Sequence, residues 1–283
     1  MAIALKGVSL KRAVMRSIVW VLVAFVGLTM LVPFLWMLIT SLKDDPQVFK
    51  WPPVWIPNPV KFKNYADAWK IAPWARFFFN SLFVSIVVTV VSLFLNSLAG
   101  FGFAKYSFPG RNLLFIYLLG TLMIPIYATM VPIFIMLKYM GWLDSYQGLI
   151  VPFLATAFGV FLMRQFFQTI PTDLIEAARM DGCPEFRIFW QIVLPISKAP
   201  LATLAIFTFQ GTWNNFIWPL IVVKRNEMRT IPLAVSALAQ GLYVMSWPQL
   251  MAGASFAITP VIVVFLLFQR YFISGISLTG LKE

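Results

Sequence analysis

The sequence predicts an all-α integral membrane protein with six transmembrane helices. Of its residues, 60% are hydrophobic and only 11% are charged, whereas soluble domains carry about a quarter charged residues. The chain also contains long stretches without Asp, Glu, Lys or Arg. These stretches suit helices, which need about 20 apolar residues to cross about 30 Å of hydrocarbon. Strand-like alternation of apolar and polar residues is absent, which argues against a barrel.

The charge-free stretches give the positions of the spans. The final stretch is the longest, but Pro232, Gly241 and Pro248 interrupt its first half, so we place one span after them. The six predicted spans are 17–42, 77–104, 112–137, 147–168, 199–223 and 250–271. Residues 1–16 would then be an amino-terminal segment, 17–273 the transmembrane domain and 274–283 a carboxyl tail.

Basic residues before the first span predict its orientation. Lys6, Lys11, Arg12 and Arg16 precede an apolar stretch of 26 residues, which exceeds the apolar core of about 7–15 residues in a signal peptide. We therefore expect an uncleaved first helix. The cations also favour a cytoplasmic amino terminus by the positive-inside rule, and a cytoplasmic carboxyl tail follows from six spans.

Composition argues against several functional classes. The chain has no histidine and one cysteine, Cys183, so no disulfide within the chain and no metal site are expected. The predicted spans contain no paired carboxylates that could serve in acid–base catalysis, so no catalytic residue is predicted. The net charge of +12 suits lipid headgroups at the ends of the spans, and no nucleic-acid-binding motif accompanies it.

The segments between the spans differ in character. Segment 43–76 is rich in Pro and Trp and is expected to form an ordered outer cap. Segments 105–111 and 138–147 are short, so the second, third and fourth spans should be neighbours.

The loop 169–198 is a charged island between two spans, and its chemistry predicts a helix, a turn and a second helix. Asp173 and Glu176 have the spacing of a capping box. Gly182 would end the first helix, and Pro184 suits the first turn of the second. The second helix should carry an apolar stripe and end at Pro195. The stripe is Phe186, Phe189, Trp190 and Val193.

Such a helix could lie on lipid, pack on its own bundle or bind a partner protein. The acidic residues argue against lipid, because helices that lie on a bilayer are usually cationic. They are Asp173, Glu176, Asp181 and Glu185.

Several motifs resemble the permeases of ABC importers. The island matches the cytoplasmic EAA signature, and motifs elsewhere are similar to the carbohydrate-uptake branch, most closely to the maltose-type second permease. The island motif consists of Glu176-Ala177-Ala178, Asp181-Gly182, Phe189, Ile192 and Leu194-Pro195. The others are Asn80-Ser81, Asn96 to Pro109, Met123-Ile124-Pro125 with Pro132, Trp213-Asn214 and Trp218-Pro219-Leu220.

The resemblance implies a six-helix ABC importer permease with a cytoplasmic coupling helix in the bacterial inner membrane. In such a system the EAA loop binds a separate ATPase subunit and transmits its motion to the pathway. By resemblance, the docking turn is Glu176, Ala177, Ala178, Asp181 and Gly182. The residues that anchor its second helix are Phe189, Ile192, Leu194 and Pro195.

The resemblance also implies partners. These are a second, homologous permease, two ABC ATPase subunits and an extracytoplasmic solute-binding protein that delivers a carbohydrate. ATP and Mg²⁺ would bind the ATPase subunits and no cofactor would bind this chain. Its nearest approach to a phosphate-binding loop, Gly275 to Lys282, lacks the adjacent Gly-Lys-Ser/Thr. The tail could contact the ATPases or be a frayed end.

Side chains that suit a sugar occur near two spans. Sugars are bound by aromatic, amide and hydroxyl groups in a concave, largely apolar site. The predicted substrate-path residues are Tyr127, Thr129, Gln210, Trp213, Asn214, Asn215 and Trp218. The sequence leaves open whether the sugar is neutral or acidic, and whether the partner permease holds most of its contacts.

An ion-coupled secondary transporter or a channel is the alternative function. Coupling to protons or sodium usually leaves ionisable residues inside the spans, and the charge-free stretches have none. Carbonyl and hydroxyl groups can also bind sodium, so the lack of ionisable residues does not exclude this alternative. The EAA island is the feature that argues against it.

Overall fold

The computed structural model describes residues 10–240 and 246–280, and the side chains of 14–240 and 246–267. The described chain is helical and contains no strand. Residues 1–9 of the predicted amino-terminal segment and 281–283 of the predicted tail lie outside the described residues. The chain divides into two compact units, one formed by 1–72 with 243–256, the other by 73–242 with 257–283.

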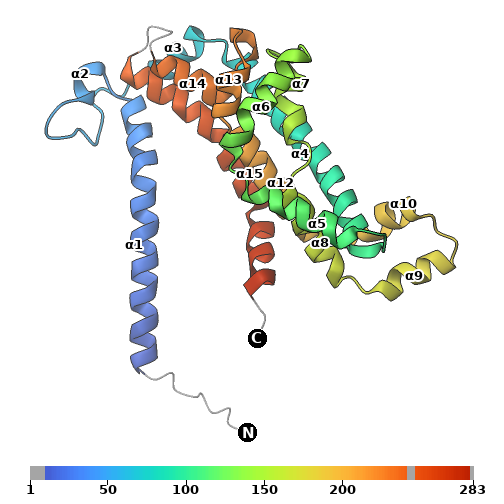
Figure 1. Ribbon diagram of the computed structural model, residues 1–283. Coiled ribbons are helices and arrows are strands. Elements are labelled where there is room, and N and C mark those ends of the chain that lie inside the picture. The colour runs from blue at the N-terminus through green and yellow to red at the C-terminus, as the bar shows by residue number, and fades with distance from the viewer. Residues whose placement is uncertain (1–9, 241–245, 281–283) are drawn as a thin grey trace. The chain divides into compact units, whose positions relative to one another are not determined.

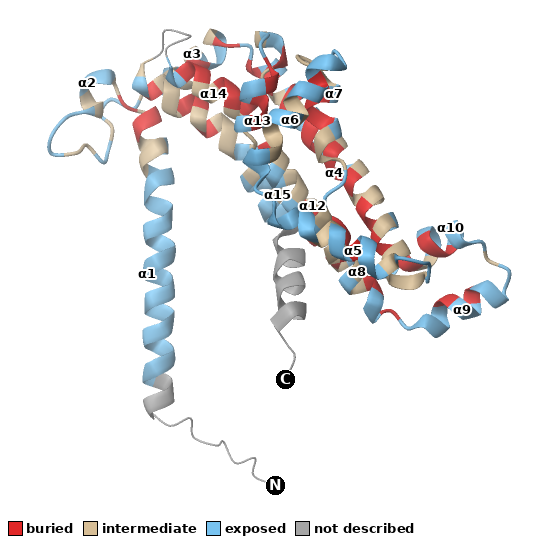
Figure 2. Cartoon of the chain, in the orientation of Figure 1, coloured by how far each residue is buried: buried red, intermediate tan, exposed pale blue. Residues whose placement is uncertain are grey.

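The first unit holds the first long helix and the segment that follows it. Its helices are α1 (Leu10–Ser41), α2 (Asp45–Val48), α3 (Lys63–Ile71) and the beginning of α15 (Trp247–Gly280). In α1, residues 14–35 are exposed throughout (Figure 2), although the helix is apolar enough to span a membrane. Such a surface suits lipid or another protein, since an apolar helix is rarely left in water.

Polar contacts order the segment after α1. Lys61 Nζ lies 2.6 Å from Asp44 Oδ1. The amide of Asn64 donates to the carbonyl oxygens of Ser41 at 2.9 Å and of Lys43 at 2.8 Å. The ring of Trp36 meets Trp55 edge to face, with centroids 5.3 Å apart. These contacts explain why a proline-rich segment takes a fixed path here, although the side of the membrane on which it lies stays a prediction.

The second unit is built around α4 (Trp74–Lys105), which packs against α8 (Ala157–Thr169) and α12 (Lys198–Trp213), as Figure 1 shows. The buried side of α4 is unusually polar, with Asn80, Ser81, Ser92 and Asn96 among its enclosed residues. Small and polar residues let helices approach closely and bond across the contact in a membrane. The elements that complete the unit are α5 (Arg111–Gly120), η1 (Thr121–Met123), α6 (Ile126–Tyr139), α7 (Tyr146–Ile150), η2 (Val151–Phe153), α9 (Thr172–Met180), α10 (Glu185–Arg187), η3 (Ile188–Val193), α11 (Leu194–Ile196), α13 (Ile217–Val222), η4 (Asn226–Met228) and α14 (Ile231–Ala239).

Three described helices are each long and apolar enough to cross a membrane, and three bent helix pairs raise that number to six if each pair is one span. The pairs bend by 100° between Met123 and Ile126, by 41° between Phe153 and Ala157, and by 84° between Ile196 and Lys198. All three breaks contain a proline or lie just after one, namely Pro125, Pro152 and Pro195, as expected for a residue that lacks an N–H donor. The predicted second, third and fourth spans are indeed neighbours, since α8 contacts both α4 and α5.

The predicted span 199–223 is interrupted in the structure. Helix α12 ends at Trp213, and α13 begins only at Ile217. The side chain of Asn215 accepts a hydrogen bond from the N–H of Trp218 at 3.2 Å, so it satisfies a backbone donor at the start of the new helix. A turn at 214–216 that contains two asparagines therefore interrupts the helix that the sequence predicts as continuous.

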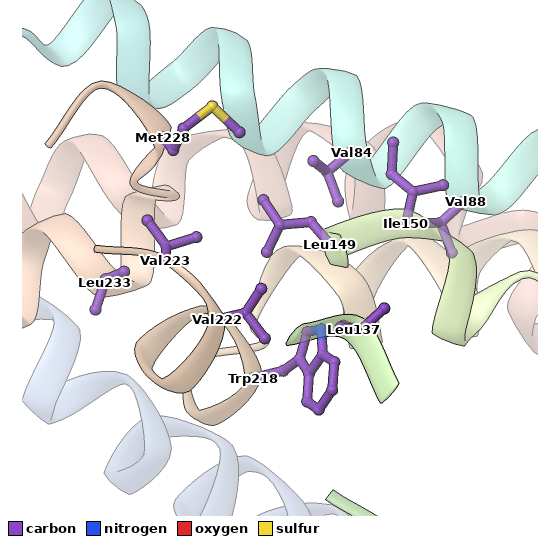
Figure 3. Packing of buried hydrophobic residues seen from close by; sticks show 10 residues of the cluster. All are labelled: Val84, Val88, Leu137, Leu149, Ile150, Trp218, Val222, Val223, Met228 and Leu233. Atoms are coloured by element: carbon purple, nitrogen blue, oxygen red, sulfur yellow. The ribbon is translucent and has the colours of Figure 1, made fainter. Parts of the chain in front are cut away.

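An apolar cluster holds the end of the unit that contains α7 and α13. In Figure 3, Trp218 and Val222 of α13 lie beside Leu137 and Leu149, which come from α6 and α7. Valines of α4 and residues of the segment 223–233 complete this cluster. Asn80, fully buried, donates to the carbonyl oxygens of Glu227 at 2.7 Å and Arg229 at 2.9 Å, which fixes that segment to α4.

Candidate functional site

The charged island forms a helix, a tight turn and a second helix at the end of the unit beyond α8, visible as α9 and α10 in Figure 1. Helix α9 ends with the N–H of Gly182 bonded to the carbonyl of Arg179 and the N–H of Cys183 bonded to that of Ala178, both at 2.9 Å. This pair of bonds defines a Schellman ending, which requires a left-handed residue. Gly182 supplies it, with φ at 75°. The predicted helix stop is confirmed.

The predicted docking residues lie in the second half of α9 and at the turn that ends it. Glu176, Ala177, Asp181 and Gly182 are exposed, whereas Ala178 is buried. Ala178 and Ile175 pack into an apolar cluster with Phe101 of α4 and Met163 of α8. The exposed residues are therefore presented on a base that is anchored to the helix bundle.

Two details of the island differ from prediction. Helix α9 begins after Pro171, so Asp173 lies within its first turn and does not form a capping box. Pro184 precedes α10 as its N-cap and its carbonyl accepts from the N–H of Arg187 at 2.8 Å. Proline fixes the chain direction here because its φ is restricted.

The second helix of the island is π-helical from Ile188 to Val193, and this changes which side chains are buried. A π-helix hydrogen-bonds residues five apart in the sequence, so Ile188 and Val193 lie on nearly the same side, and both are fully buried. Of the predicted stripe, Phe189 and Val193 are buried, while Phe186 and Trp190 are 60% and 54% exposed. The predicted four-residue stripe is therefore wrong for half of its members.

The remaining anchor residues lie at the end of the π-helical segment and in α11. Ile192 and Leu194 are half-buried against the cluster of Phe189, and Pro195 is exposed. Pro195 does not end the helix, because α11 continues to Ile196 and the chain turns at Ser197. The hydroxyl of Ser197 donates to the carbonyl of Val193 at 2.6 Å.

A polar clasp ties the turn of the island to the end of α4. The clasp consists of Tyr106, Arg179 and Glu185. Arg179 donates from Nε to Glu185 Oε1 at 2.6 Å and from Nη2 to Oε2 at 3.2 Å. The hydroxyl of Tyr106 also donates to Glu185 Oε2. Two-point contact between a guanidinium and a carboxylate fixes orientation as well as distance. The clasp thus joins the two helices of the island across the Gly182 turn.

The clasp shifts the acidity of its members. The hydrogen bonds from Arg179, and next from Tyr106, lower the pKa of Glu185. Burial, followed by the bond to Glu185, raises the pKa of Tyr106 to about 12. The lowered carboxyl pKa means that stability is gained above the unfolded-state value and lost as pH falls through the folded-state value. The raised phenol pKa costs stability only as pH rises above about 10. The clasp is therefore constant across neutral pH.

Removing the charge of Glu185 should loosen the island. We expect Glu185→Gln in the full complex to raise amide hydrogen exchange at 183–187 by about 1.4- to five-fold, since an exposed ion pair typically contributes about 0.2–1 kcal/mol. Asp173→Asn, a matched change at an exposed acid of the same island, should leave exchange unchanged. Equal exchange in both variants would show that the clasp does not hold the turn.

A second feature is a cleft of about 630 Å³ bounded by α4, α6, α8 and α12. Three predicted substrate-path residues line it, namely Tyr127, Asn214 and Asn215. The remaining walls include Thr156 and Phe158 at the beginning of α8, and Leu204, Phe207, Thr208, Gly211 and Thr212 of α12. A concave, largely apolar cleft with a few polar groups is the usual form of a small-molecule site.

The other predicted path residues do not line this cleft. Trp213 and Trp218 are each 2% exposed, and their indole N–H groups donate to the carbonyls of Ala257 at 3.2 Å and Gly148 at 2.9 Å. They act as packing residues in this structure. Thr129 bonds to the carbonyl of Ile126 in its own helix, and Gln210 is exposed on α12 outside the cleft.

Sequence reasoning missed the residues of α12 and α8 that line the cleft. Thr208 and Thr212 are four residues apart, and Gly211 lies between them on the same face of the helix. This spacing was the available signal, because helix positions three and four apart face the same way. It was weak because both sides of α12 are apolar.

The break before α8 places Thr156 and Phe158 at the cleft, and Asn96 of α4 holds it. Asn96 is fully buried. Its Oδ1 accepts from the N–H of Thr156 at 3.0 Å and its Nδ2 donates to Ser92 Oγ at 2.6 Å. A helix broken inside a membrane needs such partners, since lipid offers none to a free N–H.

Comparison with known proteins identifies relatives over most of the chain. Residues 96–278 match the model of a family described as "Binding-protein-dependent transport system inner membrane component". The chain is 40% identical to the arabinooligosaccharides transport system permease protein AraQ of Bacillus subtilis, over 80% of each chain. It is 36% identical to the sn-glycerol-3-phosphate transport system permease protein UgpE of Yersinia enterocolitica, over 82% of this chain and 85% of the relative.

The fold is also similar to a solved structure. A chain from the crystal structure of a bacterial ABC transporter involved in the import of the acidic polysaccharide alginate matches with a TM-score of 0.81. The match covers 94% of this chain and 99% of the other, with 25% identity.

Proposed function

This chain belongs to the family of inner-membrane components of binding-protein-dependent transport systems, and we propose that it forms one half of the pathway of an ATP-driven importer for a sugar or oligosaccharide. It is a multi-pass inner-membrane permease. The observation that carries the proposal is the exposed turn at Gly182, which is presented by buried residues of the island. An element that transmits force needs both an accessible surface and a rigid attachment.

The proposed partners follow from this role. A second, homologous permease would supply the other half of the pathway, and an extracytoplasmic solute-binding protein would deliver the sugar. Two separate ABC ATPase subunits would bind ATP and Mg²⁺, so this chain would bind no cofactor. The amino terminus would lie in the cytoplasm, as the basic residues before the first helix indicate.

The coupling step is assigned to the island. Glu176, Ala177, Asp181 and Gly182 would touch the ATPase, and Ala178 would join this surface to the core. Phe189, Ile192, Leu194 and Pro195 would carry motion toward α12, which follows directly after α11. The cleft lies on α12 as well, so one helix connects the coupling residues to the proposed substrate path.

The substrate path is assigned to the cleft. Tyr127, Asn214 and Asn215 support this assignment. Their hydroxyl and amide groups suit a sugar, and all three line the same cleft. The relatives' names support carbohydrate transport, and they do not favour the alternative of an ion-coupled carrier.

The proposal is tested by isolating the chain from its native membrane in mild detergent and identifying the retained proteins by mass spectrometry. A second permease, an ABC ATPase and a solute-binding protein are the expected companions. Recovery of the chain alone from membranes in which transport is active would contradict the proposal.

A further inference from the structure

The cleft is largely apolar, and its few polar side chains are uncharged. Its described lining residues offer hydroxyl groups from Tyr127, Thr208 and Thr212 and amides from Asn214 and Asn215, and none of them is Asp, Glu, Lys or Arg. Amides and hydroxyls both donate and accept hydrogen bonds. They therefore match sugar hydroxyl groups, which do the same.

Several of these groups are available for a ligand. Within the described chain, the side chains of Tyr127, Thr208, Thr212 and Asn214 form no hydrogen bond. Asn215 uses its Oδ1 for the N–H of Trp218, which leaves its amide N–H groups to donate. A hydroxyl-rich ligand would satisfy these groups without bringing charge into the cleft.

Aromatic rings form part of the same wall. Phe158 and Phe207 are 43% and 42% exposed and meet edge to face, with centroids 6.1 Å apart. Aromatic faces carry partial negative charge, so they attract the C–H face of a sugar ring and disfavour an anion placed over them.

Three arginines of the same unit contact groups that do not line the cleft. Arg225 Nη2 donates to the carbonyl of Asp144 at 2.6 Å, and Arg76 Nε donates to that of Glu227 at 3.2 Å. The guanidinium of Arg164 lies 3.8 Å from the centre of the Phe115 ring. None of the three lines the cleft. A carboxylate or phosphate placed against this wall would thus gain no countercharge from its described lining residues, which disfavours any loss of its hydration water.

We propose that the wall which this chain contributes to the pathway accepts an uncharged sugar unit and disfavours uronates and sugar or glycerol phosphates. This inference rests on the proposed import function. It separates possibilities that the relatives leave open, because one is named for arabinooligosaccharides and another for sn-glycerol-3-phosphate.

The first test is ATP-dependent uptake by the complete complex in proteoliposomes. The probes are neutral trisaccharides of arabinose and glucose, a trisaccharide of uronic acid, and sn-glycerol-3-phosphate. We expect uptake of a neutral probe at ten or more times the rate of either acidic probe. Equal or faster uptake of an acidic probe would overturn the inference and leave the proposed function standing. Uptake of none of the probes would overturn the proposed function and the inference with it.

The second test changes the charge of the wall. Asn214→Lys adds a cation at the cleft, so the ratio of acidic to neutral uptake should rise by five-fold or more. Gln168→Lys makes the same kind of change at an exposed amide of α8 that does not line the cleft, and its ratio should equal that of the wild type. An unchanged ratio in Asn214→Lys, with both probes still transported, would show that this wall does not contact the sugar.

Discussion

Replacing Gly159 by alanine is expected to destabilise the permease strongly, because this glycine is buried against α4. A Cβ atom at Gly159 would lie 2.6 Å from Cγ and Nδ2 of Asn96 and 2.9 Å from Thr156 Oγ1. Asn96 is enclosed and cannot withdraw without losing its bond to the N–H of Thr156. Overpacking of this kind costs about 1–3 kcal/mol, and an unpaired buried N–H costs about as much again.

Thermal unfolding of the purified complex measures this effect. The matched control is Gly102→Ala, because Gly102 lies within α4 and a Cβ there meets nothing within 4 Å. Its melting temperature should equal or slightly exceed that of the wild type, because alanine favours a helix interior more than glycine does. In the background of Asn96→Ala, the added cost of Gly159→Ala should shrink, because the colliding amide is gone. A melting temperature for Gly159→Ala that equals the control's would refute the tight contact.

Replacing Gly182 by valine should uncouple ATP hydrolysis from transport. A Cβ at Gly182 meets nothing within 4 Å, so space does not limit the substitution. The cost comes from its φ of 75°, which disfavours residues other than glycine by roughly 1–2 kcal/mol and a β-branched residue most. Valine should therefore shift the Schellman ending and move Glu176 and Asp181 from their positions. If valine destabilises the native conformation of this turn by about 1.4 kcal/mol, the population of that conformation falls about ten-fold. We therefore expect transport to fall by about ten-fold or more.

Asparagine provides the matched control, because it tolerates the left-handed conformation better than other side chains. Gly182→Asn should keep most transport, whereas Gly182→Val should keep normal abundance in the membrane and lose coupled uptake. Loss of transport in both variants would mean that the surface of Gly182, and not its conformation, is required. Full transport in Gly182→Val would contradict the role of this turn in coupling.

The features that depend on local chemistry were predictable from the sequence. Gly182 identifies the end of α9 because few other residues adopt its conformation. The positions of the long helices follow from where charges stop and start, since charged side chains are costly in hydrocarbon. Tyr127, Asn214 and Asn215 could be selected because their chemistry suits a sugar.

Features that depend on tertiary contacts were not predictable. The π-helical turn at Ile188–Val193 alters the periodicity that the apolar stripe assumes, and no residue in it requires that geometry. The break before α8 is stabilised by the buried side chain of Asn96, which lies 60 residues away in the sequence and accepts a hydrogen bond from Thr156. Trp213 and Trp218 have the chemistry of a sugar site, but neighbouring carbonyls and rings occupy them. Whether a tryptophan contacts a sugar or packs inside the protein depends on its burial, which the residue type alone does not predict.

The most direct test of the account is simultaneous measurement of sugar uptake and ATP hydrolysis in proteoliposomes that contain the copurified complex. ATP is placed on the ATPase side, and the solute-binding protein with its sugar on the other. We expect uptake to require both ATP and the binding protein, and hydrolysis to rise when the loaded binding protein is present. Uptake that proceeds without ATP and follows a proton or sodium gradient would contradict it.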